Sequence, residues 1–257
     1  MEVLTKNIAS YKGNIYKLVK PEHSKIGLFL THLGLGDLIN MNGAVRYLTK
    51  SVDTMYVVCK TRNSKNVSQM FEDEPKIKVL VCEQDPQDYD NLIKDIHREK
   101  VDRIIKYFSG QWINRTDYNN IPDVFYDDLM LDHSIRHSCF KLNIQSKLVV
   151  PSISYIFVHS TSSTQSIQLD SIINKNTKLV IDPNTNHYSL DHRWHSIADC
   201  YINKPIFEYI DVISNADEIH VTDSAFYCLA CYLPLKATIK KCYNRETGEV
   251  SSQYIFQ

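Results

Sequence analysis

The sequence has little glycine, no excess of charge of either sign and no long apolar run. Glycine occurs only 7 times in 257 residues, so the close pair Gly34 and Gly36 stands out. With 29 basic and 30 acidic residues, the net charge is −1, which argues against the basic surface that binds nucleic acid or an anionic membrane. No apolar run approaches the ~20 residues that span a bilayer, and the first residues lack the apolar stretch of a signal peptide. We therefore predict a soluble, cytoplasmic protein that binds no nucleic acid and has no transmembrane segment.

The seven cysteines form neither a disulfide framework nor a zinc-binding pattern. Their number is odd, and Cys228 and Cys231 make a single CxxC with no second CxxC or histidine pair downstream. A structural zinc site needs four ligands. The pair His133 and His137 has helical spacing but no third ligand nearby. We expect reduced thiols and no bound metal.

Apolar strand patterns alternate with helical patterns in both halves of the chain. The predicted strands are 26–30, 55–59, 77–82 and 101–107 in the first half, and 155–158, 178–181, 218–221 and 236–243 in the second. Strands separated by helical segments form βαβ units and parallel sheets. The architecture expected is α/β with two domains, residues 1–148 and 149–257, and a connecting helix near 124–140. Residues 1–24 are expected to add a hairpin or a covering pair of strands.

The first candidate site is a glycine turn, where the first buried strand ends and a helix expected over about 37–50 begins. Its residues of interest are His32, Gly34, Gly36, Asp37 and Asn40. Ligands bind at the carboxyl ends of parallel strands, and glycine lets a ligand approach the backbone closely. The turn is not a complete dinucleotide fingerprint, because the third glycine is absent. Spacing alone leaves two interpretations of Asp37 open, a functional carboxylate and a cap of the following helix.

A second candidate follows the strand that ends near Val158. His159 comes next, followed by the hydroxyl side chains of Ser160, Thr161 and Ser162. Hydroxyl groups both donate and accept hydrogen bonds, so this run could bind a phosphate or a sugar. Runs of serine and threonine also form ordinary loops.

A third candidate is the strand-to-helix turn at Asp223 and Ser224, where Ala225 and Phe226 open the helix. The first amides of a helix have no partner within the helix and can bind phosphate. A carboxylate beside a phosphate would repel it, which favours contact of Asp223 with its own loop or with a sugar hydroxyl. The alternative is that the two residues only cap the helix.

In this order the three motifs resemble the ADP-heptose:lipopolysaccharide heptosyltransferases (glycosyltransferase family 9-like) and related GT-B glycosyltransferases. The likeness lies in the Gly34–Asp37 turn, the His159–Thr161 strand end and the turn at 214–224, and it spans about residues 26–235. It implies a GT-B-like fold, in which two Rossmann-like parallel-sheet domains face each other across a cleft. The N-terminal domain would bind the acceptor and the C-terminal domain the nucleotide-sugar.

The resemblance also implies the reaction and its residues. The protein would transfer a sugar from a nucleotide-sugar donor to a hydroxyl of a glycan or glycolipid acceptor, with inversion and without metal or cofactor. Asp37 would be the general base, in an acceptor-side turn with His32, Gly34, Gly36 and Asn40. The donor-binding residues would be His159, Ser160, Thr161, Ser162, Arg193, Asp223, Ser224, Ala225 and Phe226.

Three positions depart from the family pattern. Ala225 replaces a glycine, Cys228 stands where a histidine is usual, and no lysine accompanies the hydroxyl run after His159. Arg193 is expected to supply that missing charge from elsewhere. The departures leave open a non-catalytic GT-B-like module that binds a nucleotide or glycan. A GT-B-type nucleotide-sugar epimerase is a further alternative, which would need additional acid/base carboxylates.

Overall fold

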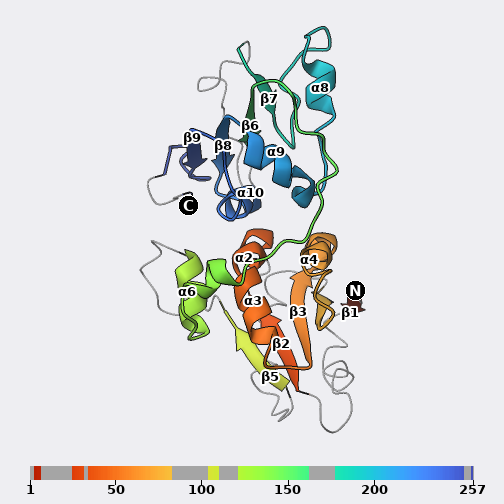
Figure 1. Cartoon of the computed structure of the whole chain (residues 1–257), viewed down its shortest axis with the longest axis vertical. Helices are drawn as coiled ribbons and strands as arrows, with labels where there is room; N and C mark the ends of the chain where they lie inside the picture. The colour runs from red at the N-terminus through yellow and green to blue at the C-terminus, as the bar shows by residue number, and fades with distance from the viewer. Residues whose placement is uncertain are drawn as a thin grey trace. The chain divides into compact units, whose positions relative to one another are not determined.

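The computed structural model describes residues 3–6, 25–31, 34–82, 104–109, 121–161, 177–251 and 256. The chain divides into two compact units, Met1–Asn143 and Ile144–Gln257, each of which carries one sheet (Figure 1). No helix among the described residues is long and apolar enough to cross a bilayer. The assignment of the first half to the acceptor and the second to the donor stays a prediction.

In the described part of unit 1, five parallel strands form one sheet in the order β1-β4-β3-β2-β5. The strands are β1 (Val3–Lys6), β2 (Ile26–Leu30), β3 (Thr54–Lys60), β4 (Ile77–Cys82) and β5 (Ile104–Phe108). Every residue of β2 is buried, as expected for a parallel strand covered on both faces. Because β3 and β5 lie on opposite sides of β2, the chain changes its winding direction there. This switch point is where open α/β sheets bind ligands.

The strands predicted from residue 26 to residue 107 lie within three residues of the observed ones. Val3–Lys6 pairs in parallel with β4 at the edge of the sheet. The rest of the expected N-terminal hairpin, at 7–24, lies outside the described residues.

Two helices, α2 (Leu35–Asn40) and α3 (Asn42–Thr49), replace the single helix predicted after the glycine turn. The fully buried phenol of Tyr126 joins them across the break. Its hydroxyl donates to the Asn40 carbonyl at 3.2 Å and accepts from the Ala44 amide at 3.1 Å. These two bonds satisfy backbone groups that the break would otherwise leave unpaired inside the protein.

The predicted connecting helix near 124–140 is also divided, into α6 (Ile121–Asp128) and α7 (Ile135–Ser138). The short α7 packs on α3. A Cβ atom at Gly43 would lie 2.6 Å from the Ile135 carbonyl oxygen, so the close approach of the two helices requires glycine at this position.

A buried ion pair ties α3 to the segment after α4. Helix η2 (Thr61–Asn63) leads into α4 (Ser64–Met70), which packs on β3 and β4. The Arg46 guanidinium lies 2.7 Å from the Asp73 carboxylate, and Lys141 Nζ lies 2.8 Å from the other oxygen of the same group. The Asp73 carboxylate therefore links α3 to the segment after α4 and to Lys141.

The described part of unit 2 holds four parallel strands in the order β7-β6-β8-β9. The strands are β6 (Tyr155–His159), β7 (Leu179–Ile181), β8 (Glu218–Thr222) and β9 (Ile239–Tyr243). They also lie within three residues of their predicted positions. Here β6 is flanked by β7 on one side and β8 on the other, so the second switch point lies between β6 and β8.

The helices of unit 2 are short and pack on this sheet (Figure 1). They are α8 (His195–Asp199), η4 (Ile206–Tyr209), α9 (Ile210–Asn215) and α10 (Ala225–Ala230). The rings of Phe157, Tyr209 and Phe226 pack together with centroids 5.4–6.0 Å apart. Both units are Rossmann-like α/β structures, as predicted.

Replacement of Tyr126 by Phe should destabilise unit 1. The change removes one hydroxyl and leaves the Asn40 carbonyl and the Ala44 amide without their partner, which should cost about 1–3 kcal/mol. Urea unfolding of the variant measures the loss. Tyr47→Phe is the matched control, since Tyr47 is 41% exposed. Equal stability of the two variants would contradict a structural role for the Tyr126 hydroxyl.

Candidate functional site at the ends of the parallel strands

The glycine turn follows β2, at the switch point of unit 1. Gly34 is extended, with φ −68° and ψ 143°, and α2 begins at Leu35. The Asp37 side chain folds back over the turn, because a Cβ atom at Gly34 would lie only 2.5 Å from Asp37 Oδ2. A side chain at position 34 would displace this carboxylate. His32 lies outside the described residues.

Asp37 is not the N-cap of the helix, because α2 starts two residues earlier than predicted. It lies in the first helical turn after Gly36 and is half-buried, where a carboxylate is stabilised by the helix dipole. Asn40 ends the same helix and is buried, with its carbonyl bonded to Tyr126. The structure therefore brings Gly34, Gly36 and Asp37 into one turn and places Asn40 behind it.

His159 lies at the carboxyl end of β6, at the switch point of unit 2. Its Nδ1 atom is 3.2 Å from Thr222 Oγ1 and 3.1 Å from Ser224 Oγ. Its ring packs on Phe226 with centroids 4.5 Å apart. Burial lowers the pKa of His159 to about 4, and the nearby Asp182 charge opposes this effect. The imidazole is therefore neutral at physiological pH and links the ends of β6 and β8.

A buried carboxylate that the sequence analysis did not select lies beside it. Asp182 directly follows β7 and is 1% exposed. Its Oδ2 accepts hydrogen bonds from Ser160 Oγ at 2.7 Å and from His187 Nε2 at 3.0 Å. Its Oδ1 accepts from the Asn184 amide at 2.9 Å. Three donors thus surround the carboxylate, which is the arrangement that a buried negative charge requires.

Ser224 occupies the N-cap position of α10 but makes no side-chain capping bond. Its hydroxyl bonds to His159 instead, so the interpretation of this turn as a simple cap is wrong for the serine. The neighbouring Asp223 lies 4.0 Å from the guanidinium Nε of Arg245, which comes from the segment after β9. Arg245 is a cation that the structure brings to this end of the sheet, and no motif of the sequence had indicated it.

The other residues predicted to bind the nucleotide-sugar lie in several different places. Thr161 follows Ser160 and is half-buried, and Ala225 and Phe226 form the first turn of α10. Arg193 is exposed, with its guanidinium carbon 4.3 Å from the centre of the Trp194 ring. Its predicted contact with the donor stays a prediction. Ser162 lies outside the described residues.

No family model matches the sequence, and no curated protein matches it. The chain is similar in fold to TibC. A bacterial iron-containing dodecameric glycosyltransferase TibC from enterotoxigenic E. coli H10407 superposes with a TM-score of 0.54 at 14% identity, over 86% of this chain and 59% of that chain. The dodecameric iron-containing heptosyltransferase TibC in complex with ADP-D-beta-D-heptose gives 0.53 at 14% identity, over 88% and 59%.

This likeness establishes the fold. It confirms the GT-B-like α/β class and, at the level of fold, the resemblance to heptosyltransferases stated from the motifs. A glycosyl transferase family 9 structure from Veillonella parvula DSM 2008 is also similar, with a TM-score of 0.46, 11% identity and 87% of each chain covered. The present chain spans about 59% of the length of TibC.

The described residues offer no ligand set for the iron named in TibC. No group of three or more His, Cys, Asp or Glu side chains in this part of the chain could hold a metal ion. The His133 side chain is half-exposed, and its Nε2 atom lies 2.9 Å from an Asp127 carboxylate oxygen.

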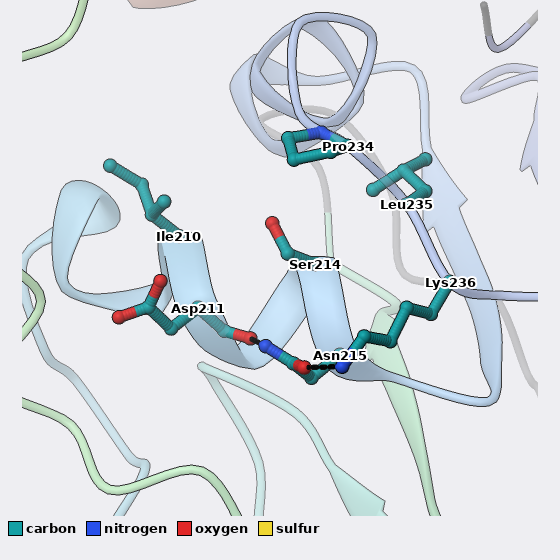
Figure 2. Close-up of a pocket in the computed structure, with 7 residues that line it drawn as sticks. All are labelled: Ile210, Asp211, Ser214, Asn215, Pro234, Leu235 and Lys236. Carbon is teal, nitrogen blue, oxygen red and sulfur yellow. Dashed lines mark hydrogen bonds between the residues drawn. The ribbon is translucent and has the colours of Figure 1, made fainter.

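An open groove of about 450 Å³ lies away from the switch point of unit 2. Its lining residues, drawn in Figure 2, are Ile210, Asp211, Ser214, Asn215, Pro234, Leu235 and Lys236. Asn215 and Lys236, which bond to each other there, come just before β8 and β9. The groove therefore reaches the amino ends of these strands, whereas Ser224 and Arg245 follow their carboxyl ends.

Asp182 and Arg245 could have been found from the sequence, because each follows a predicted strand. Asp182 comes directly after 178–181, and Arg245 comes two residues after 236–243. The rule that selected Asp37, His159 and Asp223 applies equally to them. His187 carries no such signal, because it reaches Asp182 from within a loop.

The neutral state of His159 makes the stability of unit 2 sensitive to acid. Because its pKa falls from an ordinary 6.5 to about 4 on folding, the unfolded chain binds the proton first. The contribution of the neutral imidazole is complete above pH 6.5 and is lost as the pH falls toward 4, by up to about 3 kcal/mol.

We expect His159→Gln, which cannot titrate, to lose less stability than wild type between pH 6.5 and pH 4. Unfolding free energies measured across this range test the difference. His195→Gln, at a less buried histidine of the same unit, is the control and should follow wild type. Parallel curves for wild type and His159→Gln would show that His159 is not held neutral.

Proposed function

We propose that the chain is a glycosyltransferase that moves a sugar from a nucleotide-sugar donor to a hydroxyl of a glycan or glycolipid acceptor. One observation supports this proposal: polar side chains gather at the switch point of the second sheet, in a fold similar to a heptosyltransferase solved with ADP-D-beta-D-heptose. The carboxylate of Asp37 lies at the switch point of the first sheet. Switch points are the places where such sheets bind nucleotides.

Unit 2 would bind the donor. The Ser224 hydroxyl and the Phe226 ring, at the start of α10, both contact His159 at the end of β6. Arg245 lies beside Asp223 with a half-exposed side chain. Its positive charge offsets the carboxylate and would stabilise the diphosphate that leaves during transfer. Amides, hydroxyls and this guanidinium together take the role of a divalent cation.

Unit 1 would bind the acceptor, with Asp37 as general base. The carboxylate takes the proton of the acceptor hydroxyl while the hydroxyl oxygen forms a bond to the anomeric carbon of the donor. The bond from that carbon to the nucleoside diphosphate breaks, and the diphosphate leaves with the bonding electron pair. Because attack and departure occur on opposite sides in one displacement, the anomeric configuration is inverted.

A non-catalytic module that binds the same ligands is the second candidate. Ala225 and Cys228, in place of the glycine and histidine of the family pattern, favour it. Cys228 lies on α10, where its amide bonds to the Ser224 carbonyl at 3.1 Å. The backbone of this turn is therefore intact, and only its side chains differ from the pattern.

A panel of ADP, GDP and UDP sugars tests the function and the role of metal together. We expect release of the nucleoside diphosphate from one of them, by transfer or slow hydrolysis, at a rate unchanged by EDTA. Chelation should have no effect because the proposed leaving-group stabilisers are protein groups. Strict dependence on Mn²⁺ or Mg²⁺ would contradict the mechanism, and binding without any turnover would support the non-catalytic module.

Replacement of Asp37 by Asn should remove the base and leave the turn in place. The amide is isosteric and loses the interaction of a charge with the helix dipole, about 0.3–1 kcal/mol of stability. The turnover number should fall by roughly 10²–10⁴. Steady-state transfer assays and urea unfolding measure the two effects.

Asp211→Asn is the matched control, since Asp211 also lies in the first turn of a short helix. It should keep full activity and lose a similar small amount of stability. An Asp37→Asn enzyme that retains more than about a tenth of wild-type turnover, with chemistry rate-limiting, would exclude Asp37 as the base.

A further inference from the structure

The cluster of Ser160, Asp182 and His187 presents hydrogen-bond acceptors and no donors to a ligand. An ionised carboxylate only accepts hydrogen bonds, so the proton of the Ser160 hydroxyl and the proton on His187 Nε2 both point to Asp182 Oδ2. The Ser160 oxygen then has only lone pairs left. In the neutral imidazole the second nitrogen, Nδ1, is likewise an acceptor.

The cluster reaches the surface at His187, and Ser160 is buried beside it. The His187 side chain is 16% exposed and Ser160 is 6% exposed, whereas the Asp182 side chain is fully covered. Ser160 belongs to the segment that leaves β6, and Asp182 and His187 belong to the segment that leaves β7. The cluster therefore occupies the β6–β7 end of the carboxyl edge.

Phosphate does not fit this end of the sheet. A phosphate oxygen needs donors, and the two polar groups here have committed their protons to Asp182. The buried negative charge of Asp182 would also repel it. Positive charge lies toward β8 and β9 instead, at Arg245 beside Asp223.

We propose that the Ser160–Asp182–His187 cluster binds a sugar hydroxyl of the donor, and that the diphosphate lies at the β8–β9 end of the same edge. This inference rests on the proposed function and deepens it by fixing the direction in which the donor lies. Ser160 and His187 contact the hydroxyl, and Asp182 positions them. The hydroxyl belongs to the ribose or to the transferred sugar, and the probes below distinguish these two sources.

The test compares binding of inorganic pyrophosphate, a nucleoside diphosphate, its 2′,3′-dideoxy form and its glucose conjugate by calorimetry at pH 8. The nucleotide is whichever of ADP, GDP and UDP wild type binds. The variants are Ser160→Ala, His187→Ala and Asp182→Asn. The matched controls are Ser214→Ala and His195→Ala, in the same unit but outside the cluster.

We expect Ser160→Ala and His187→Ala each to weaken binding of the glucose conjugate by about tenfold, the loss of one hydrogen bond. Pyrophosphate affinity should change less than twofold, and the controls should match wild type. Asp182→Asn should weaken binding of the glucose conjugate more than Ser160→Ala or His187→Ala does. If Asp182→Asn does not fold, the two alanine variants carry the test.

Arg245→Gln, unlike the cluster variants, should weaken the binding of pyrophosphate as much as the binding of the nucleotide ligands. Its matched control is Lys236→Gln, which also removes one positive charge. Loss of affinity for the nucleoside diphosphate in Ser160→Ala, absent with the dideoxy form, assigns the hydroxyl to the ribose. Loss confined to the glucose conjugate assigns it to the transferred sugar.

Two different results would overturn the proposal. If Ser160→Ala and His187→Ala weaken the binding of pyrophosphate as much as the binding of the glucose conjugate, phosphate lies at the cluster. Only the proposed orientation of the donor would then be wrong. A wild-type protein that binds none of the nucleotides or their glucose conjugates would contradict the nucleotide-sugar function itself, and the orientation with it.

Discussion

Parallel pairing of the strands is the constraint on which the candidate site depends. In a parallel sheet all strands end at the same edge, so residues far apart in the chain meet after their strands. The pairing of β6 with β8 brings His159 opposite Val221. His159 therefore lies close to Ser224, which follows Val221 by three residues, and the two side chains form a hydrogen bond. An antiparallel pairing of the same strands would have sent these groups to opposite edges.

The polar groups at this edge are ordered by burial and by proton placement. His159 is kept neutral by desolvation, while the adjacent Asp182 carboxylate accepts hydrogen bonds from three donors. This edge therefore has hydrogen-bond acceptors near β7 and the positive charge of Arg245 near β9. In a nucleotide-sugar the diphosphate lies between the ribose and the transferred sugar, so a hydroxyl of one of these two sugars can reach the acceptors while the diphosphate lies beside the positive charge.

Much of the fold could be predicted from the sequence, because buried parallel strands are continuous apolar runs that alternate with helical patterns. Helix boundaries were less predictable. The break between α2 and α3 depends on Tyr126, which is 82 residues from Ala44, and no local pattern records such a contact. Helix α2 also begins at Leu35, two residues before the predicted start, so Asp37 lies inside its first turn. The bond between Ser224 and His159 and the contact of His187 with Asp182 likewise arise only from tertiary structure.

Hydrogen–deuterium exchange of the protein with ADP, GDP or UDP tests the central claim most directly, since it maps where a nucleotide binds. The account predicts slower exchange in peptides that cover 159–161 and 222–227, at the ends of β6 and β8. Exchange should not change in peptides that cover 210–215 and 234–236, around the groove of Figure 2. Protection confined to the groove, or no protection by any of the three nucleotides, would contradict the account.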